Sequence, residues 1–384
     1  MIQWWYSISD TLQAILAVLA VVGLYQLYFL MRYMLLRRSC VKPKDSSEKP
    51  DNEQVKGVSV IVAAKNEAEN IRTYLHALLE QDYPLFEVIV VNDGSEDDTQ
   101  EVLDDYATRY KDLHLTFVPQ QAKVISSKKL AITLGVKAAK YDYLLLTDAD
   151  CCPASPHWIK EMVRGFDNEK TDIVLGYGAY FHRHTFLNRL IQYETLLTGL
   201  QYMGMAVAGH PYMGVGRNLA YKKSLFVLNN GFVGFTNEQA GDDDLLVNRL
   251  AQGRNTSVVC TRDSLTWSVP ESKWSDWWQQ RKRHLSVAPR YRIGSRLRIG
   301  LEPLTRMLWY AGIAALLIVG TPVLQIAAAG LFLMRWCLQW IVYNVSAKRL
   351  GVPAVGTELM LWDWLYPLIT LWIMWLPKQK NRYW

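Results

Sequence analysis

Cysteine is scarce in this sequence of 384 residues, with five in all and no C-x-x-C pair. An odd number without paired spacing is not typical of a disulfide-rich scaffold or of a cysteine zinc site, and we expect neither. The adjacent residues Cys151 and Cys152 are poorly spaced for sharing one metal ion. We therefore expect them to be small, buried apolar residues.

Two common nucleotide-binding signatures are also missing. No G-x-x-x-x-G-K-[ST] sequence occurs, and no G-x-G-x-x-G follows the first expected strand. These absences disfavour a P-loop NTPase and a Rossmann dehydrogenase.

Charge is absent from residues 11–31, and Arg335 is the single charged residue in 307–347. Tryptophan shows the opposite distribution, because only Trp158 and Trp267 of the 15 lie within 41–270. Residues 11–31 would form a helix about 30 Å long, which matches the hydrocarbon thickness of a bilayer. Since tryptophan is enriched at membrane interfaces, the sequence predicts a soluble middle between membrane-associated ends.

The flanking charges indicate how the chain crosses the membrane. Arg32, Arg37 and Arg38 follow the first apolar segment, which indicates a retained anchor with its basic side in the cytoplasm. Residues 307–347 suit two helices joined at 320–322. A third apolar stretch, 359–376, is expected to span, although the basic residues after it conflict with the positive-inside rule. A re-entrant or interfacial segment is the alternative.

These patterns divide the chain into five parts. The expected parts are an anchor at 1–38, a linker at 39–56, a catalytic domain at 57–270, interfacial amphipathic helices at 271–304, and a membrane region of two to three helices at 305–384. We expect an integral protein of a bacterial inner membrane, with the catalytic domain facing the cytoplasm.

The soluble middle alternates between short apolar runs and helical patterns. Strands are expected at 58–64, 86–91, 113–118 and 143–146, and helices after Asn66, which can cap the first of them, and at about 97–110 and 128–140. This alternation predicts an α/β fold with a doubly wound, mostly parallel sheet. Ligands of such sheets bind beyond the carboxyl ends of the strands, where Asp93, Asp148 and Asp150 lie.

Two acidic motifs carry candidate chemistry. Asp148 and Asp150 can present two hard oxygen ligands to Mg²⁺ or Mn²⁺, although such aspartates also occur in ordinary turns. Three acids in a row, Asp242 to Asp244, open an amphipathic helix. The helix dipole favours acids there, but their mutual repulsion also raises a pKa, as suits a general base.

Positive charge is concentrated between Glu271 and Arg306, which accounts for the net charge of +6. An amphipathic helix on anionic lipid and arginines that clamp a diphosphate are compatible interpretations. The aromatic residues interleaved here lie next to predicted membrane, so we do not expect nucleic-acid binding.

The ordered set of motifs resembles membrane-bound family 2 glycosyltransferases, which are inverting GT-A enzymes that include hyaluronan, chitin and cellulose synthases. The matching segments are SVIVAAKNEAENI (59–71), VIVVNDGSEDDT (88–99), KKLAITLGVKAA (128–139), LLLTDAD (144–150), GDDDLLVNRL (241–250) and QRKRH (280–284). The resemblance implies a GT-A domain between N-terminal and C-terminal transmembrane helices.

The resemblance also implies roles for individual residues. The residues that would bind the nucleotide sugar are Ala63, Ala64, Asn66, Glu67, Asp93, Lys128, Asp148, Gln280, Arg283 and His284. The metal ligands would be Asp148 and Asp150, for Mg²⁺ or Mn²⁺. Asp243 aligns with the catalytic base, with Asp242 or Asp244 as the shifted choice.

Two departures limit what the resemblance implies. His284 replaces the tryptophan that lines the acceptor site in processive members, and Thr133 replaces the usual asparagine after the lysine. With few membrane helices as well, we expect transfer of one or a few sugars, UDP-linked by default, to a lipid-linked or lipid acceptor in cell-envelope glycan synthesis.

Other interpretations stay open. A processive polysaccharide synthase and a non-catalytic sugar-nucleotide-binding membrane protein are the alternatives, and oligomers or envelope-glycan assembly partners are not excluded. Residues 186–216 are expected to form the acceptor-side wall or, equally, ordinary core.

Overall fold

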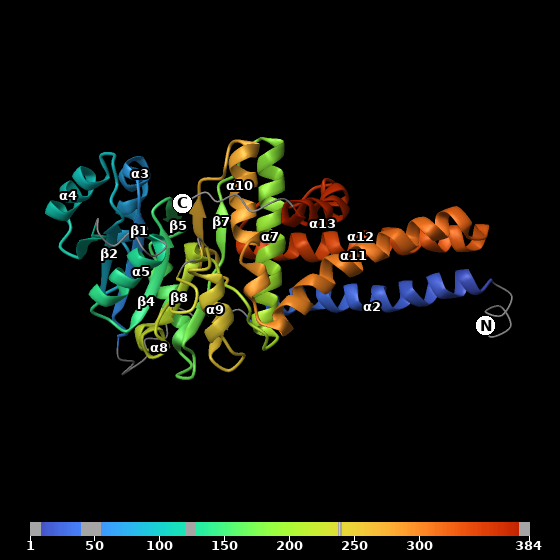
Figure 1. Ribbon diagram of the computed structural model, residues 1–384, viewed down its shortest axis with the longest axis horizontal. Coiled ribbons are helices and arrows are strands. Elements are labelled where there is room, and N and C mark those ends of the chain that lie inside the picture. Colours follow the sequence, from blue (N-terminus) through green and yellow to red (C-terminus); the bar gives the residue numbers. More distant parts are fainter. Residues whose placement is uncertain (1–8, 40–54, 120–126, 237, 239, 376–384) are drawn as a thin grey trace.

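The computed structural model describes residues 9–39, 55–119, 127–236, 238 and 240–375. It has a sheet-containing body with a group of long helices extending from one side (Figure 1). The predicted linker, 39–56, lies largely outside the described residues, as do the side chains of Arg37 and Arg38.

Seven strands form the main sheet, and they confirm the expected α/β fold. In spatial order they are β3 (Leu113–Phe117), β2 (Phe86–Asn92), β1 (Val58–Ala64), β4 (Tyr143–Asp148), β8 (Leu219–Lys222), β6 (Ile173–Leu175) and β9 (Thr256–Val258). The first four run parallel, whereas β8 is antiparallel to β4 and β6. The sheet is therefore mostly parallel, and its central strands bring the ends of β1 and β4 together.

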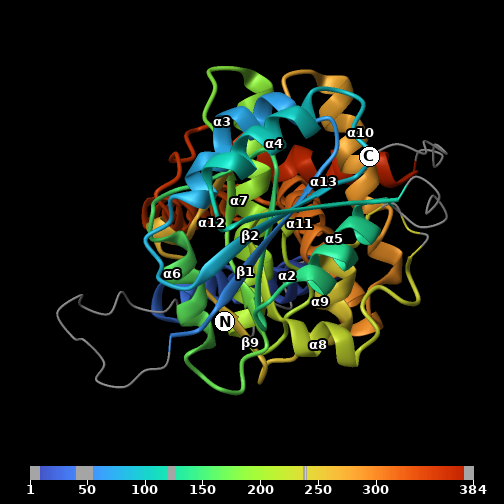
Figure 2. The same cartoon turned by 90° about the vertical axis from the view of Figure 1, so that its left-hand side faces the viewer.

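Each face of this sheet has its own hydrophobic core. In β1, Val60 and Val62 pack with α3 (Ala68–Leu79), α4 (Thr99–Arg109) and α6 (Trp158–Val163). Helices α3 and α4 lie next to each other (Figure 2). Ile61 and Ala63 face the other core, with α5 (Ser127–Ala138), α7 (Phe186–Val207) and α9 (Asp244–Leu250). Because side chains alternate along a strand, Ala63 points to the face that carries α5 and α9.

A second, three-stranded sheet lies beside the end of β4. Its strands, in spatial order, are β5 (Cys151–Pro153), β10 (Thr266–Ser268) and β7 (Gly178–Tyr180). The remaining short elements are α8 (Lys223–Leu228) and the single-turn helices η2 (Arg164–Phe166), η3 (Gly216–Asn218), η4 (Arg262–Ser264) and η5 (Ala288–Arg290). Because β5 begins directly after Asp150, this small sheet anchors the aspartate turn.

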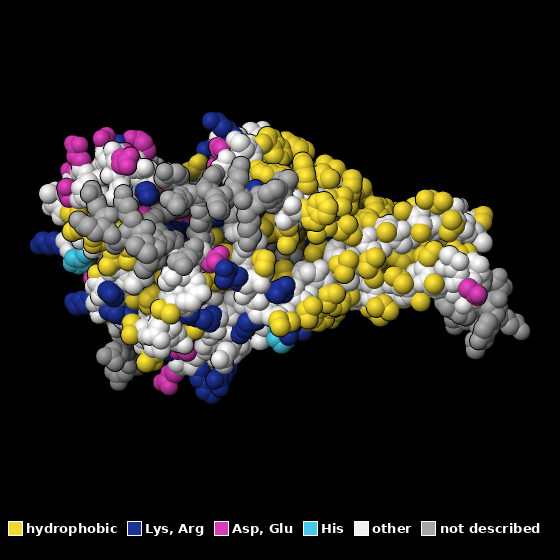
Figure 3. Space-filling view, viewed as in Figure 1, with side chains coloured by type: hydrophobic (Ala, Val, Ile, Leu, Met, Phe, Trp, Pro, Cys, Tyr) yellow, Lys and Arg dark blue, Asp and Glu magenta, His cyan; other side chains and the backbone are white. Residues whose placement is uncertain are grey.

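Within the described residues, three helices are long and apolar enough to cross a membrane. They are α2 (Asp10–Ser39), α11 (Ile293–Val319) and α12 (Pro322–Leu350). Hydrophobic side chains cover this end of the molecule in Figure 3, and Leu24, Ile318 and Ile326 are each about 70–80% exposed. Such apolar exposure fits contact with lipid rather than with water.

The expected connection between two C-terminal helices is present, since α11 ends at Val319 and α12 begins at Pro322. However, α11 already begins at Ile293 and continues through Pro303. The proposed division at 304/305 therefore falls inside one continuous helix, because a change in composition does not by itself end a helix.

Helix α13 (Leu359–Trp375) has 17 residues and lies against α7, α10 (Trp274–Leu285) and α11. It runs crosswise to the long helices in both ribbon views (Figures 1 and 2). The span expected at 359–376 stays a prediction, and the crosswise direction favours its interfacial alternative.

A buried polar network joins α13 to the long helices. Asp363 is fully buried, and its Oδ2 accepts a hydrogen bond from Arg335 Nη1 at 2.6 Å. Its Oδ1 accepts one from Gln339 Nε2 at 2.6 Å, and Arg335 Nη2 donates to Gln26 Oε1 at 2.9 Å. Arg335, the lone charge of 307–347, is thus compensated by a carboxylate from another helix.

The expectation of no disulfide is wrong, because Cys260 is disulfide-bonded, whereas Cys151, Cys152 and Cys337 are free. Pairing depends on tertiary proximity, which spacing along the chain does not reveal.

Candidate functional site

A cavity lies where β1 and β4 end, opposite α5 and the acidic loop. Its lining residues are Ile61, Ala63, Lys128, Ile132, Leu146, Thr147, Asp148, Gly216, Asp242 and Asp243. Five of these residues, Ala63, Lys128, Asp148, Asp242 and Asp243, were named as site residues from the sequence. The fold therefore brings together motifs that are as much as 180 positions apart in the sequence.

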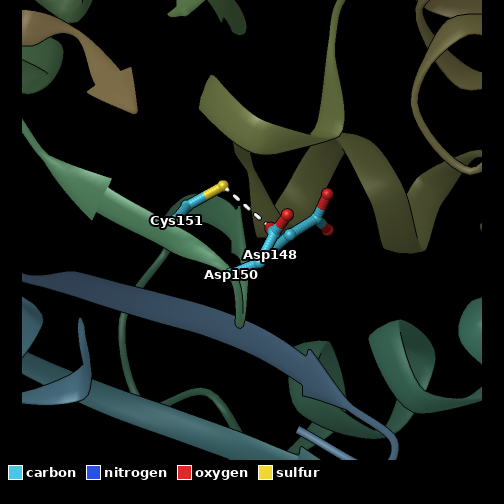
Figure 4. A group of neighbouring side chains, drawn as sticks. All are labelled: Asp148, Asp150 and Cys151. Atoms are coloured by element: carbon cyan, nitrogen blue, oxygen red, sulfur yellow. Dashed lines mark hydrogen bonds between the residues drawn. The ribbon is translucent and has the colours of Figure 1, made fainter. Parts of the chain in front are cut away.

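The aspartate turn connects the two sheets. Asp148 is the last residue of β4, and Asp150 precedes β5, so both side chains leave the same tight turn (Figure 4). One ligand atom from each of Asp148, Asp150 and Cys151 lies within 4.8 Å of the others. Two carboxylates at this spacing fit a hard divalent cation.

The electrostatics of the turn also fit a cation. Burial, and then the negative charge of Asp148, raise the pKa of Asp150. Burial works against ionisation of Asp148 too, but Lys128 outweighs it and keeps the pKa of Asp148 below its usual value. A divalent cation between the two carboxylates would relieve their repulsion.

Cys151 belongs to the same group of side chains, but its chemistry differs. Its Sγ donates to Asp150 Oδ1 at 3.4 Å and lies 3.0 Å from Ser268 Oγ. Burial, followed by the charge of Asp150, raises the pKa of this thiol well above its usual value. A protonated thiol is a poor ligand for Mg²⁺ or Mn²⁺, so Asp148 and Asp150 remain the candidate pair.

Lys128 connects the two acidic motifs. Its Nζ lies 2.8 Å from Asp148 Oδ1 and 3.4 Å from Asp242 Oδ2. The neighbouring Lys129 is buried and donates instead to the carbonyl oxygens of Glu238 and Ala240, at 2.5 and 2.7 Å. The two lysines thus have separate tasks, because one faces the cavity and the other secures the segment before the acidic loop.

Asp243 is fixed by the backbone on both sides. It caps α9, with Oδ1 accepting from Asp244 N at 2.7 Å and Oδ2 accepting from Gly216 N at 2.6 Å. Burial, followed by the charge of Asp242, raises its pKa to about 6. Because each carboxylate oxygen has a second lone pair, Asp243 can still accept a proton in this position.

Asp244 lies apart from the other two acids. Its Oδ2 accepts a hydrogen bond from Tyr291 OH at 2.7 Å, and it does not line the cavity. Its position favours a structural role, in which it joins α9 to the segment before α11.

Hydrogen bonds join the loop after β1 to the loop after β2. Asn66 N donates to Ser95 Oγ at 2.9 Å, and Glu96 N donates to Asn66 Oδ1 at 2.8 Å. Asn66 has a positive φ of 57° and does not cap α3, so that part of the expectation is wrong. The side chain is used to bridge the two loops instead, which fixes the site formed by both.

The other residues expected in these loops lie near the same edge. Asp93 is buried, its backbone N donates to Ala64 O at 2.8 Å, and its Oδ2 lies 3.8 Å from Lys65 Nζ. Burial is the main cause that raises the pKa of Glu67, and the charges of Asp150 and Asp148 add to it. Glu67 therefore lies within electrostatic reach of the aspartate turn.

The motif at 280–284 lies on α10, where Gln280 and Arg283 share a face because they are three positions apart. Gln280 Nε2 donates to Glu271 Oε1 at 3.3 Å. The charge of Arg283 contributes to the lowered pKa of Asp148, so Arg283 lies within electrostatic reach of the aspartate turn. His284 is exposed at the last turn of this helix.

Glu194 is a residue that sequence reasoning missed. It is 1% exposed on α7, accepts hydrogen bonds from Trp277 Nε1 at 3.1 Å and Tyr366 OH at 2.8 Å, and forms an ion pair with Arg281 Nη1 at 2.9 Å. It therefore ties α10 and α13 to the catalytic domain. The available signal was a single carboxylate within a long apolar segment, which usually has a partner when buried.

Helix α7 makes up most of the segment expected to be the acceptor-side wall or ordinary core. Sixteen of its 22 residues are buried. It packs against α2, α12 and α13, which supports the core interpretation for most of its length.

Comparisons with known proteins agree with this fold. Residues 59–226 match glycosyl transferase family 2, and residues 143–376 match glycosyl transferase family group 2. A poly-beta-1,6-N-acetyl-D-glucosamine synthase of Staphylococcus epidermidis is 27% identical over 239 residues, which are 61% of this chain and 55% of the relative. YdaM of Bacillus subtilis, a probable glycosyltransferase, is 24% identical over 280 residues, which are 70% and 63% of the two chains.

The matches thus span 55–63% of the length of these curated relatives. Among solved structures, the mannosyltransferase PcManGT from Pyrobaculum calidifontis, in complex with GDP-Man and Mn²⁺, has a TM-score of 0.58. It is 21% identical, with 95% of this chain and 99% of that chain covered. At this level of identity the likeness shows a shared fold.

Proposed function

This chain belongs to glycosyltransferase family 2, and from that membership we propose that it transfers a sugar from a nucleotide-diphosphate sugar to a hydroxyl group of a lipid-linked or lipid acceptor. The supporting observation is the cavity that unites Lys128, Asp148, Asp242 and Asp243 at the carboxyl ends of β1 and β4. Transfer proceeds with inversion, in one displacement, and a UDP-linked hexose or N-acetylhexosamine is the favoured donor.

The loops after β1 and β2 bind the nucleoside part of the donor. Ala63 and Ala64 end β1, and Asn66, Glu67 and Asp93 follow at the same edge of the sheet. Small side chains at 63 and 64 leave room for the base, and carboxylates can accept hydrogen bonds from ribose hydroxyls.

Positive groups bind the diphosphate. Lys128 lies beside Asp148 in the cavity, and α10 carries Gln280 and Arg283. Arginine and lysine stabilise the charge that grows on the leaving diphosphate. His284, at the end of the same helix, is assigned to the donor side as well.

Asp148 and Asp150 hold a divalent cation, Mg²⁺ or Mn²⁺. Their oxygens suit either ion, and the related fold of PcManGT was solved with Mn²⁺. When bound, the cation supplies positive charge to the diphosphate of the donor.

Asp243 is the general base. As the acceptor oxygen attacks the anomeric carbon, the proton of that hydroxyl passes to the Asp243 carboxylate, and the bond from the anomeric carbon to the diphosphate breaks with its electron pair leaving on the diphosphate. A pKa of about 6 keeps Asp243 ionised at neutral pH yet basic enough to accept a proton. The backbone donors at Gly216 and Asp244 hold it in place.

The position of α10 supports a membrane-bound acceptor. Trp278 on α10 packs on Trp372 of α13 with ring centroids 5.0 Å apart, and α13 adjoins the long apolar helices. The helix with the donor-binding motif therefore lies next to the membrane-facing part, where a lipid-linked hydroxyl would arrive.

A processive polysaccharide synthase is the second candidate, favoured by the relatives named poly-beta-1,6-N-acetyl-D-glucosamine synthase. His284 in place of the motif tryptophan favours limited transfer instead. The two candidates differ in product length, which a sizing gel measures directly.

One experiment tests the proposal. Detergent-purified protein is incubated with a panel of UDP- and GDP-sugars and a native lipid extract, and the released nucleoside diphosphate and the mass of each lipid are measured. We expect release of one nucleoside diphosphate together with a lipid that gains the mass of one or a few sugars. A long polymer would support the synthase, and no turnover of any donor would support the non-catalytic alternative.

A further inference from the structure

Arg217 occupies a central position that the proposed reaction does not yet use. The backbone of Gly216 and Arg217 lies between the two acidic motifs. Gly216 N donates to Asp243 Oδ2 at 2.6 Å, and Thr147 Oγ1, next to the aspartate turn, donates to Arg217 O at 3.0 Å. Thr266 Oγ1 donates to the same carbonyl at 2.9 Å. These bonds fix the start of the Arg217 side chain relative to both motifs.

The guanidinium group is held rigidly by neutral partners. Nη1 donates to Ala179 O at 2.9 Å and to Ser268 Oγ at 3.2 Å, and the guanidinium carbon lies 4.0 Å from the centre of the Tyr180 ring. Within the described part of the chain, Nε and Nη2 donate no hydrogen bond, so these donors are available to a ligand.

The same contacts place the group beside Asp150. Ser268 Oγ, which accepts from Arg217, lies 3.0 Å from Cys151 Sγ, and that thiol donates to Asp150 Oδ1. The charge of Arg217 acts on Asp148 and Asp150, and also on His284 of α10. Arg217 is thus connected to the aspartate turn through Ser268 and Cys151.

Its charge has no direct counter-ion in the described structure. Lys128 contacts two carboxylates, whereas Arg217 forms no ion pair among the described residues. A half-buried guanidinium held only by a carbonyl, a hydroxyl and a ring pays a desolvation penalty that an anion would offset. The planar, forked donors of arginine match the oxygens of a phosphate group.

We propose that Arg217 is a donor-binding residue whose guanidinium contacts the diphosphate of the nucleotide sugar beside the aspartate turn. It acts together with Lys128 and Arg283, and its positive charge also stabilises the diphosphate as it leaves. This inference rests on the proposed function, because it requires a nucleotide-diphosphate donor.

The test measures binding without turnover. Full-length protein in detergent is titrated with UDP and GDP, each with Mn²⁺, by isothermal calorimetry, and with the corresponding nucleoside monophosphate. For Arg217→Gln we expect the nucleoside diphosphate to bind about 10- to 100-fold more weakly, as loss of a charge-assisted contact implies. Binding of the nucleoside monophosphate should weaken less. The affinity of Arg217→Lys for the nucleoside diphosphate should lie between those of the wild type and Arg217→Gln.

Arg254→Gln is the matched control, because Arg254 is exposed on the loop before β9 and loses the same charge. Far-UV circular dichroism and thermal unfolding show whether each variant is folded. If Arg217→Gln is unfolded, the comparison of binding is made between Arg217→Lys and the wild type. Binding of the diphosphate by a folded variant within twofold of wild type would overturn the inference. Unchanged binding with a raised KM for the acceptor would assign Arg217 to the acceptor instead. A wild type that binds no nucleoside diphosphate would reject the proposed function itself.

Discussion

The Oε2 atom of Glu194 accepts a hydrogen bond from the indole Nε1 of Trp277 at 3.1 Å, which joins the buried helix α7 to the helix that carries Gln280 and Arg283. Oε1 of the same carboxylate forms an ion pair with Arg281 on α10 and accepts a hydrogen bond from Tyr366 on α13. The placement of the donor-binding helix thus depends on one buried side chain and on its contact with α13.

We predict that Glu194→Gln lowers kcat/KM for the donor by about 10- to 100-fold, because the partly buried Arg281 loses its counter-charge and α10 shifts. Steady-state kinetics at varied donor concentration measure the effect, and Trp277→Phe, which removes one hydrogen bond, should show a smaller loss. Arg189→Gln, exposed on the same helix, is the control. If Glu194→Gln lost thermal stability but kept its donor KM and kcat, the positioning role would be refuted.

The raised pKa of Asp243 predicts an acid limb in the pH–rate profile. The base must be ionised to accept a proton, so kcat/KM should fall as the pH drops below about 6 and level off above it. Asp243→Asn should lower kcat about 10²- to 10⁴-fold, the range of general base catalysis.

Asp242→Asn separates the two candidate bases. Because Asp242 raises the pKa of Asp243, its neutralisation should move the acid limb to lower pH and leave substantial activity. If Asp242→Asn instead abolished turnover and Asp243→Asn did not, Asp242 would be the base.

A divalent cation should stabilise the protein as well as support turnover. EDTA should abolish transfer, and Mn²⁺ or Mg²⁺ should restore it. Without any donor present, Mn²⁺ should raise the thermal unfolding temperature, because it binds the folded state and offsets the repulsion between Asp148 and Asp150. Since protons compete for Asp150, whose pKa is raised, the shift should shrink as the pH falls.

Asp150→Asn should weaken Mn²⁺ binding at least about 10-fold, whereas Cys151→Ser should change it little. Equal Mn²⁺ affinity in Asp150→Asn and wild type would place the cation elsewhere.

The sequence was informative where structure is local. Short apolar runs end in acidic loops, and so the strand ending at Asp148 and the helix opened by Asp243 were predicted within a residue or two. The location of Asp148 and Asp150 at a strand end followed from the expected parallel sheet, whereas Lys128 was implied only by the family resemblance. Their relative distances and the direction of each side chain needed the folded chain.

Other features depended on contacts between distant segments. Asn66 was expected to cap a helix, but a partner on the next loop, Glu96, captures its side chain. Arg217 followed an apolar stretch and carried no motif, because its role arises from Ser268 and Ala179 on two other strands. Glu194 likewise belongs to no sequence motif, and its contacts become visible only when the fold brings α10 and α13 next to it.

The buried carboxylate of Asp363 provides a last test, on stability. It accepts hydrogen bonds from Arg335 and Gln339 and lies 3.3 Å from Arg306 Nη1. Asp363→Ala leaves the Arg335 guanidinium buried without its counter-charge, which should lower the free energy of unfolding by about 3–5 kcal/mol.

Asp363→Asn keeps the acceptor for Gln339 and should lower the free energy of unfolding by less than Asp363→Ala. Asp10 is exposed at the start of α2, and Asp10→Asn should leave the free energy of unfolding unchanged. Thermal unfolding in detergent measures all three, and nucleoside diphosphate binding shows whether the catalytic domain remains folded. Because α13 also holds Glu194 through Tyr366, Asp363→Ala should lower donor turnover in the protein that stays folded. Wild-type stability of Asp363→Ala would mean that Arg335 finds another partner and that the network does not secure α13.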